Sequence, residues 1–179
     1  MTDMRPERLT LERLATPIGE ALVVTDEAGR LRAFNWRDYE ARMLAWIGRH
    51  YPKTPLAEGR CAGPVRQALL AYFAGDASAL DGVAWVASGT PFQLKVWETL
   101  CTIPRGETLS YAQLAERIGR PTAVRAVGLA NGANPISLVV PCHRVIGADG
   151  SLTGYGGGLP RKRWLLAHEG ASFKEQMAA

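Results

Sequence analysis

The sequence predicts an α/β protein of the α+β type, with a small N-terminal mixed sheet and a mainly helical C-terminal half. Short apolar runs alternate with turn residues over residues 9–36, which is typical of strands. Apolar residues recur at helical spacing after residue 39, and two capping boxes start helices after residue 89. The 179 residues suit one domain or two small ones that share a contact, and we place the two at 1–85 and 86–179.

We predict that the first domain contains three strands and one or two helices. The strands cover residues 9–14, 21–25 and 31–36, separated by turns at 16–19 and 26–29, where Gly, Pro and Asp cluster. Helical spacing then predicts helices over about 39–50 and 65–73. No catalytic constellation is visible here, so we assign residues 1–85 a supporting role.

The second domain begins with strong helix signals. Thr90 and Ser110 each stand three residues before a glutamine, as in a capping box. The helix that follows Ser110 should stop at Gly119, and Thr122 can cap another helix through about residue 130. Two short helices joined by a tight turn predict a helix-turn-helix.

The charge of the chain is uneven. Residues 1–85 hold 11 basic and 11 acidic side chains, whereas residues 86–179 hold 10 basic and 6 acidic ones. This excess favours an anionic partner such as DNA, although a merely soluble basic surface remains an alternative. In the final helix, basic residues 161–163 and Glu169 oppose the helix dipole, which suggests phosphate contacts for the former and an acceptor role for the latter.

The helix after Thr122 carries one charge among many small residues. Small side chains suit close approach to a backbone or a narrow groove, whereas a helix that reads major-groove bases usually carries polar residues near its start. Arg125 is poorly explained by packing alone. Close packing of a buried helix is the alternative.

The apolar run Leu138–Val140 predicts a buried strand that ends at Pro141, because proline cannot donate to a sheet ladder. Cys142 would then sit at the end of a rigid element, where a reactive group can be aimed. A thiol needs a base or a positive environment to ionise at neutral pH. Neighbours on a strand point to opposite faces, so a water between Cys142 and His143 is more natural than direct contact. The alternative is that Cys142 is a small buried hydrophobe.

The segment Pro141-Cys142-His143-Arg144-Val145 resembles the active-site motif of the O6-alkylguanine-DNA alkyltransferases. Asn134-Pro135 and Gly154–Gly158 match the same family, in its bacterial constitutive branch, and the resemblance extends from about Leu9 onward. It implies DNA repair by a suicide methyltransferase. The alkyl group of O6-alkylguanine, and of O4-alkylthymine, would pass irreversibly to Cys142 in a single turnover. It also implies an RNase H-like topology for the first domain.

The resemblance implies roles for individual residues. Glu169 would orient His143, which takes the proton of Cys142 through water, while Asn134 holds the backbone and Tyr111 donates a proton to the leaving guanine. Substrate contacts are expected from Val145, Tyr155, Gly156 and Gly157, where Gly156 replaces the serine of some relatives. The expected DNA contacts are Thr122, Ala123, Arg125, Ala126 and Gly128, with Arg125 filling the gap left by a flipped nucleotide.

The expected partner is double-stranded DNA bearing alkylated bases, bound through the minor groove with base flipping. No cofactor is needed, because the DNA itself donates the alkyl group. Cys61, Cys101 and Cys142 form no zinc-ligand pattern with the histidines, so no metal site is expected. No apolar run could span a bilayer and no signal region is visible, so we expect a cytoplasmic protein. We expect a monomer that could cluster on DNA.

Three other functions compete with this interpretation. A cysteine-dependent hydrolase would pair Cys142 with a distant histidine such as His168 and would turn over. A non-catalytic binder of alkylated DNA is disfavoured by the cysteine, because relatives of that kind carry tryptophan there. A transcription regulator is disfavoured by the lack of base-reading side chains.

Overall fold

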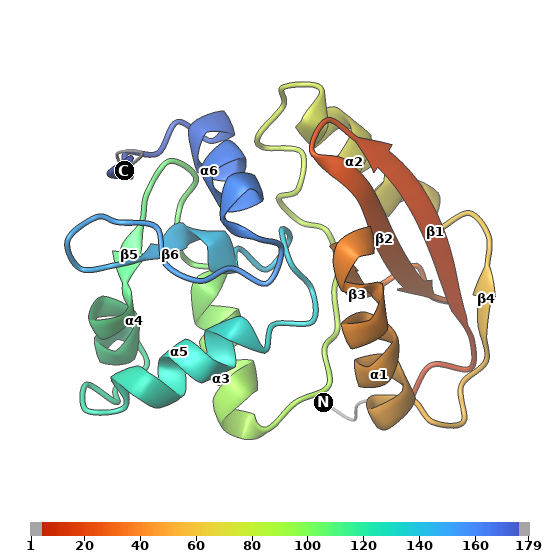
Figure 1. The fold of residues 1–179 in the computed structure, drawn as a ribbon. Helices are drawn as coiled ribbons and strands as arrows, with labels where there is room; N and C mark the ends of the chain where they lie inside the picture. Colours follow the sequence, from red (N-terminus) through yellow and green to blue (C-terminus); the bar gives the residue numbers. More distant parts are fainter. Residues whose placement is uncertain (1–4, 176–179) are drawn as a thin grey trace. The chain divides into compact units, whose positions relative to one another are not determined.

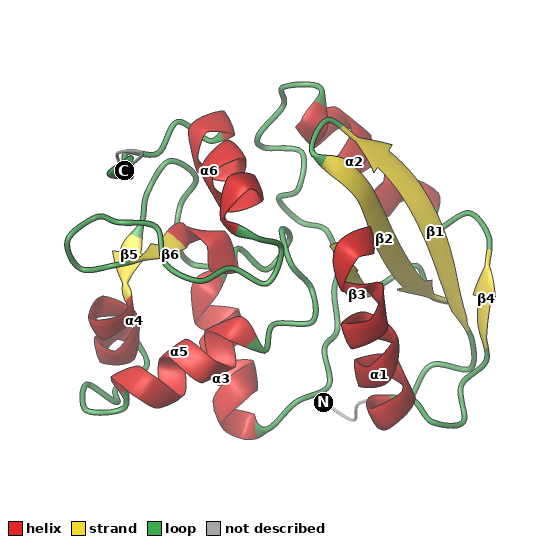
Figure 2. Ribbon diagram, in the orientation of Figure 1, coloured by secondary structure: helices red, strands yellow, loops and turns green. Residues whose placement is uncertain are grey.

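The structure, a computed structural model, describes residues 5–175 and divides into two compact units, one ending at Ser88 and one starting at Gly89 (Figure 1). Figure 2 shows that the first unit carries the larger sheet, whereas the second is mostly helical. The predicted mixed α/β class is confirmed. The RNase H-like topology stays a prediction.

The first unit is built on a four-stranded sheet with the order β3-β2-β1-β4. The two hairpin pairs, β1 with β2 and β2 with β3, are antiparallel, and β4 lies parallel to β1. The three predicted strands are therefore present. The strand β4 was not predicted, because it is too short to give a clear sequence pattern. The elements of this unit are β1 (Leu9–Thr16), β2 (Gly19–Asp26), β3 (Leu31–Trp36), the 3₁₀ helix η1 (Arg37–Tyr39), α1 (Glu40–His50), β4 (Leu56–Glu58) and α2 (Gly63–Phe73).

Helices cover both faces of this sheet. Alternate strand residues such as Leu22 and Val24 pack with Met43 and Ile47 of α1 in one apolar cluster. On the opposite face, the Trp36 ring meets the Phe73 ring of α2 edge-on, with centroids 6.3 Å apart. Because strand side chains alternate between faces, a sheet whose residues are apolar on both sides must be covered twice.

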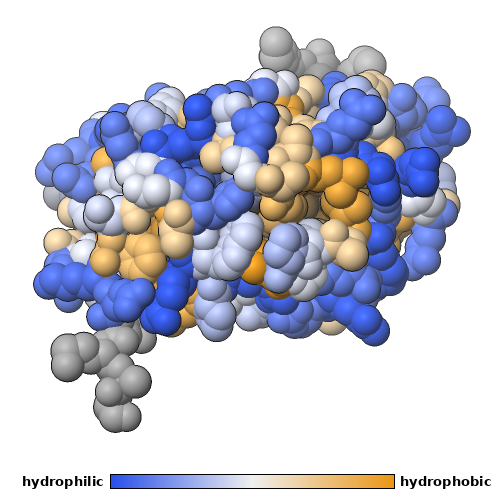
Figure 3. All heavy atoms as spheres, turned by 90° about the horizontal axis from the view of Figure 1, so that it is seen from above, coloured by the Kyte–Doolittle hydropathy of each residue, from blue (hydrophilic) through white to orange (hydrophobic). Residues whose placement is uncertain are grey.

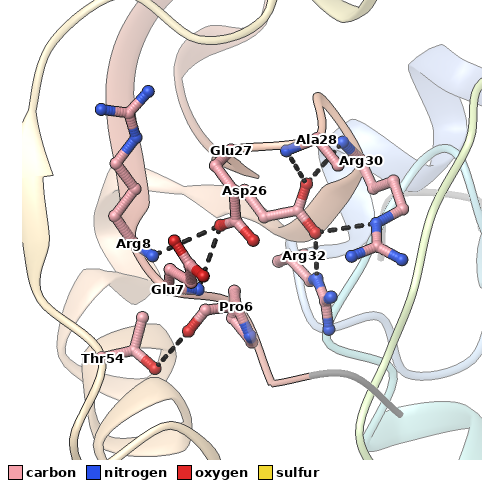
Figure 4. A network of polar contacts seen from close by, with 9 residues as sticks. All are labelled: Pro6, Glu7, Arg8, Asp26, Glu27, Ala28, Arg30, Arg32 and Thr54. Carbon is pink, nitrogen blue, oxygen red and sulfur yellow. Dashed lines mark hydrogen bonds and ion pairs between the residues drawn. The ribbon is translucent and has the colours of Figure 1, made fainter. Parts of the chain in front are cut away.

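A buried ionic cluster closes the β2–β3 turn (Figure 4). One oxygen of Asp26 accepts from the Ala28 and Arg30 N–H groups at 3.1 and 2.9 Å, and the other accepts from the Arg30 and Arg32 Nε atoms at 2.9 and 2.7 Å. The side chains of Asp26 and Arg32 are both 0% exposed. Burial raises the pKa of Asp26, but the hydrogen bond from the Arg30 N–H and the Arg32 guanidinium outweigh it, so that pKa lies below its usual value.

Over residues 89–175, the second unit contains four α-helices and one short parallel strand pair, β5 with β6. Helix α5 packs against both α3 and α4. The elements of this unit are α3 (Pro91–Leu100), β5 (Leu109–Ser110), α4 (Tyr111–Arg117), α5 (Val124–Gly132), the 3₁₀ helix η2 (Cys142–Arg144), β6 (Val145–Ile146) and α6 (Leu159–His168).

The two predicted capping boxes are confirmed. The hydroxyls of Thr90 and Ser110 each accept from the N–H three residues on, and the glutamine side chain reaches back in both cases. Helix α4 ends at Arg117, and Gly119 follows with φ +74°, a conformation that favours glycine. The prediction that Thr122 caps the next helix is wrong, because α5 begins after Ala123 and has no side-chain cap.

The predicted strand at residues 138–140 is also wrong. This segment forms a turn, after which Cys142–Arg144 form η2. Leu138 has φ +76°, which is outside the strand region, and the Val140 N–H bonds locally to the Ile136 carbonyl at 3.1 Å. Local hydrogen bonds thus replace the ladder that a β-branched apolar run suggested.

No helix within residues 5–175 is both long and apolar enough to cross a membrane. On the face drawn in Figure 3, hydrophilic residues cover much of the surface and hydrophobic residues are exposed in patches.

Candidate active site

Cys142 opens η2 and is buried, with 4% of its surface exposed. The segment before it is fixed by Asn134, which follows α5. The Asn134 amide donates to the Val140 carbonyl at 2.8 Å and its oxygen accepts from the Ile136 N–H at 3.0 Å. A single side chain therefore bridges both ends of the turn that leads to Cys142. This agrees with the backbone-holding role expected of Asn134.

His143 is fully buried and is held by Glu169 at the end of α6. The His143 Nε2 atom lies 3.0 Å from the Glu169 Oε1 atom. Arg144 binds both oxygens of the same carboxylate, through Nε at 2.9 Å and Nη2 at 3.1 Å, and its Nη1 donates to the Ile103 carbonyl. The Glu169 carboxylate, whose position opposes the helix dipole, is thus the centre of a buried network.

The charges of this network follow from its contacts. Burial raises the pKa of Glu169, but His143 and Arg144 outweigh burial, so the Glu169 pKa lies below its usual range and the carboxylate is ionised. Burial lowers the pKa of His143 despite the opposing effect of Glu169, so the imidazole is neutral near pH 7.

The protonation state of His143 fixes what its second nitrogen can do. A neutral imidazole beside an ionised carboxylate carries its proton on Nε2, which donates to Glu169. The Nδ1 atom is then a hydrogen-bond acceptor, and it is buried with no hydrogen-bond partner within residues 5–175. No protein group within residues 5–175 occupies this acceptor, and it belongs to the residue next to Cys142, so it can bind a water or a proton. The arrangement can therefore accept a proton at Nδ1.

The parallel pairing of β5 with β6 brings Tyr111 into the same region. Ser110 pairs with Ile146, which comes soon after η2, and Tyr111 is the first residue of α4. The Tyr111 hydroxyl accepts from the Thr153 hydroxyl at 3.3 Å, and a side chain added at Gly128 of α5 would meet the Tyr111 ring. Tyr111 is half-buried, so its position is compatible with a proton donor as well as with packing.

The predicted glycine-rich loop forms a turn before α6. The Gly158 N–H donates to the Tyr155 carbonyl at 2.9 Å, so that Gly156 and Gly157 form the tip of the turn. The Tyr155 ring stands edge-on to the His143 ring with centroids 6.4 Å apart. Arg161 donates to the Gly157 carbonyl at 2.9 Å. The loop is thus tied both to the imidazole and to the first turn of α6.

One prediction about the basic residues 161–163 is wrong. Its side chain is fully buried, so Lys162 cannot be a surface phosphate contact. The Lys162 Nζ atom donates to the carbonyls of Val145 at 2.5 Å, Thr153 at 2.7 Å and Gly154 at 3.4 Å. Arg163 is exposed and Arg161 is half-buried, so a phosphate role stays open for these two.

The predicted DNA-contact helix, α5, presents its expected residues to solvent. Thr122, Arg125 and Ala126 are exposed, and Ala123 and Gly128 are partly exposed. Arg125 makes no hydrogen bond or ion pair within the described residues. Leu129, one turn after Arg125, is 72% exposed although it is apolar. Packing therefore accounts for Val127 and Ala130, which are buried, and leaves the Arg125 side of the helix open.

Sequence reasoning missed two members of the site. Arg144 was quoted only as part of the motif, and its two bonds to Glu169 arise from tertiary contact. Lys162 was assigned to the surface. One signal could have found it: Lys162 lies three and four residues before Leu165 and Leu166, on the apolar face of the helix.

No group of three or more metal-ligating His, Cys, Asp or Glu side chains occurs in the described part of the chain. His168, which a hydrolase could have used, stacks on the Trp164 ring with centroids 4.5 Å apart. Cys61 is buried, and burial raises its pKa to about 12, so it is a poor nucleophile.

Comparison with known proteins shows which family this chain resembles. The DNA-binding domain profile described as 6-O-methylguanine DNA methyltransferase matches residues 91–171. A protein of Shigella flexneri named methylated-DNA--protein-cysteine methyltransferase is 52% identical over 165 residues, which cover 91% of this chain and 96% of that protein.

Two solved structures from Mycobacterium tuberculosis have the same fold. Its O6-methylguanine methyltransferase is 43% identical, has a TM-score of 0.74, and the match covers 90% of this chain and 93% of that one. A structure of its OGT in complex with DNA has a TM-score of 0.76 at 41% identity, over 90% of this chain and 92% of that one.

Proposed function

Because the chain belongs to the O6-methylguanine DNA methyltransferase family, we propose that it repairs DNA by moving the alkyl group of O6-alkylguanine onto Cys142. One observation supports Cys142 as the residue that accepts the alkyl group. The His143 Nδ1 atom, in a buried network next to this cysteine, has no partner within residues 5–175 and can receive the thiol proton. O4-alkylthymine is the expected second substrate. The thioether product is stable, so each molecule acts once.

The first step is ionisation of the thiol. The proton of Cys142 passes to the His143 Nδ1 atom, through a water as we expect, and the resulting imidazolium is stabilised by Glu169. The relay needs Glu169 to remain ionised, which its contacts with His143 and Arg144 support. A thiolate is a soft nucleophile suited to displacement at carbon.

The second step is displacement. The Cys142 sulfur forms a bond to the alkyl carbon while the bond from that carbon to the guanine oxygen breaks, and the electron pair goes to the base. A proton delivered to the ring by Tyr111 completes the neutral guanine. The Tyr111 hydroxyl can in turn be reprotonated through the Thr153 hydroxyl, which contacts it.

Recognition of the base would use main-chain groups. We expect the carbonyls of Cys142 and Val145 to accept from the exocyclic amine of guanine. Each already accepts one hydrogen bond, from the Val145 N–H and from Lys162 respectively, and a carbonyl has room for a second. Tyr155, Gly156 and Gly157 would form the wall of the base site.

The base can reach a buried cysteine only after it leaves the DNA stack. We propose that α5 enters the minor groove, where its small residues Ala123, Ala126 and Gly128 allow close approach. Arg125 would fill the space left by the flipped nucleotide and bind the orphaned partner base. Its exposure, and its lack of a partner within residues 5–175, support this role. We expect one copy of the chain to act on each lesion.

The test of the overall function is a mass measurement. The protein is incubated with a duplex carrying O6-methylguanine, and both products are weighed. We expect one methyl group per protein molecule, located on Cys142, and no second turnover. Cys142→Ser should take up none. A methyl group on Cys61 or Cys101, or many turnovers, would contradict the proposal.

Base flipping is tested by a ratio of rates. Arg125→Ala should slow reaction with duplex DNA much more than reaction with free O6-alkylguanine base, which needs no flipping. Arg125→Lys should rescue only partly, because lysine keeps the charge but lacks a planar group that can stack. If the ratio of duplex to free-base rates is the same in wild type and both variants, Arg125 is not the wedge.

A further inference from the structure

Lys162 is a buried cation that the mechanism described above does not use. Its side chain is 0% exposed, and its ammonium donates to three main-chain carbonyls. It forms no ion pair with a carboxylate within residues 5–175. Burying an ammonium without a counter-charge is costly, and carbonyl dipoles offset only part of that cost. A cation kept under these conditions points to a use for its charge.

The three carbonyls place this charge between the two halves of the proposed site. Val145 directly follows η2, which carries Cys142 and His143, whereas Thr153 and Gly154 begin the glycine-rich loop. The Lys162 ammonium therefore joins the nucleophile's segment to the loop expected to hold the base. The two carbonyl bonds at 2.5 and 2.7 Å restrict where the ammonium can move.

The charges of η2 and of the residue that follows α6 cancel. On η2, His143 is neutral and Arg144 is positive, and on α6, Glu169 is negative and bound to Arg144. Tyr111 and Tyr155 add two phenols, and Arg161 of α6 adds a half-buried guanidinium that donates to the Gly157 carbonyl. Lys162 is thus the fully buried positive charge that no carboxylate within residues 5–175 balances when Cys142 is a thiol.

Lys162 and Cys142 also influence each other electrostatically. Burial lowers the pKa of Lys162 to about 8, and a negative charge on Cys142 opposes that shift. The interaction must be reciprocal: if a thiolate favours the ammonium, the ammonium favours the thiolate.

We propose that Lys162 is a positioning residue whose buried ammonium stabilises the Cys142 thiolate, while its carbonyl contacts hold the glycine-rich loop against the nucleophile's segment. The inference rests on the proposed function and deepens it. His143 receives the thiol proton, and Lys162 stays protonated and keeps the resulting anion stable until its sulfur bonds to the alkyl carbon. The charge is then left without an anion, so repair should itself lower the proton affinity of Lys162.

The main experiment measures the ionisation of Cys142 without DNA. Full-length protein reacts with iodoacetamide across a range of pH, and mass spectrometry follows the peptide that contains Cys142. Lys162→Met keeps the length of the side chain and removes its charge. We expect the pH of half-maximal reaction to rise by about one unit or more, as for loss of a nearby opposite charge. The matched control is Lys95→Met, an exposed lysine on α3, which should leave the profile unchanged.

A second experiment needs no variant, in case Lys162→Met fails to fold. The chain has four lysines, Lys53, Lys95, Lys162 and Lys174, so their side-chain NMR signals can be assigned. The pKa of Lys162 is measured before and after Cys142 is alkylated by iodoacetamide. Alkylation removes the anion, so the pKa of Lys162 should fall while that of Lys95 stays constant.

The outcomes separate this inference from the proposed function. An unchanged iodoacetamide profile in folded Lys162→Met, or an unmoved Lys162 pKa after alkylation, would overturn the inference even if repair is slow. A slow repair rate with a normal profile would mean that Lys162 only holds the loop. Failure of the wild-type protein to accept a methyl group from DNA would instead refute the proposed function, whatever the profile shows.

Discussion

The two units each bury a carboxylate between basic side chains, and the two clusters differ in one respect. Around Asp26, every hydrogen-bonding position of the carboxylate is used, by two N–H groups and two guanidinium groups. Around Glu169, the network continues through His143 and stops at Nδ1, which has no partner in the described chain.

The difference separates a cluster that closes a turn from one that can carry out a reaction. A closed cluster stabilises one conformation, because each group is already satisfied. An open cluster has a buried acceptor that no protein group within residues 5–175 occupies, so it can bind a water or a proton. Such an acceptor is expected where a group must receive a proton during the reaction. The comparison predicts that changes in the two clusters will have separable effects on stability and on transfer.

The largest effect on methyl transfer is expected from Glu169→Gln. Glutamine can still accept from the His143 Nε2–H group, but it cannot stabilise the imidazolium by charge. Loss of the carboxylate also removes the effect that raises the pKa of His143, so His143 becomes a weaker base. Methyl transfer should slow by about 10²-fold or more, and the free energy of unfolding should fall by about 3 kcal/mol.

Single-turnover kinetics and urea unfolding measure the two effects of Glu169→Gln. Glu98→Gln, at an exposed position on α3, is the matched control and should change neither quantity. A variant that loses stability but transfers at the wild-type rate would show that the Glu169 cluster is structural, as the Asp26 cluster is.

Asp26→Asn should affect stability alone. Because the side chains of Asp26 and Arg32 are both fully buried, removing the charge leaves a guanidinium without its counter-ion. We expect a loss of about 3–5 kcal/mol in the free energy of unfolding at pH 7. The transfer rate per folded molecule should equal that of wild type. A slower transfer rate in folded Asp26→Asn would show that the Asp26 cluster does not affect stability alone.

The same variant gives a pH test. The pKa of Asp26 is lower in the folded chain than its ordinary value of 3.8, so its contribution to stability is complete above that value. The contribution disappears as pH falls through the folded-state pKa. The difference in stability between wild type and Asp26→Asn should therefore be constant near neutral pH and shrink in acid. Urea unfolding at a series of pH values measures it.

The smallest effect is expected from an exposed network in the first unit. Arg13 pairs with Glu40 and Glu58 at 2.6 and 2.9 Å, but these side chains are partly or largely exposed. Glu40→Gln should lower the melting temperature much less than Asp26→Asn does, and added salt should reduce even that difference. A large fall in melting temperature that salt does not change would show that burial does not explain the difference between this exposed network and the Asp26 cluster.

Sequence patterns determined the elements that depend on local chemistry. The three strands of the first sheet, both capping boxes and the stop at Gly119 follow from side chains within a few residues of one another. The motif around Cys142 and the charge of Glu169 opposing the helix dipole also identified the two ends of the proposed relay. Such features need no knowledge of distant contacts.

The run Leu138–Val140 has the composition of a strand, but Asn134, only a few residues away, binds the carbonyls at both ends of that turn, which composition does not reveal. Tertiary structure decided which charged side chains are buried and what they contact. Lys162 and Arg163 are adjacent and both basic, yet one is buried and the other exposed, because the rotation of α6 about its axis is set by the packing of Leu165 and Leu166. Burial and the partner of a charge depend on residues far away in the chain, so composition alone cannot predict them.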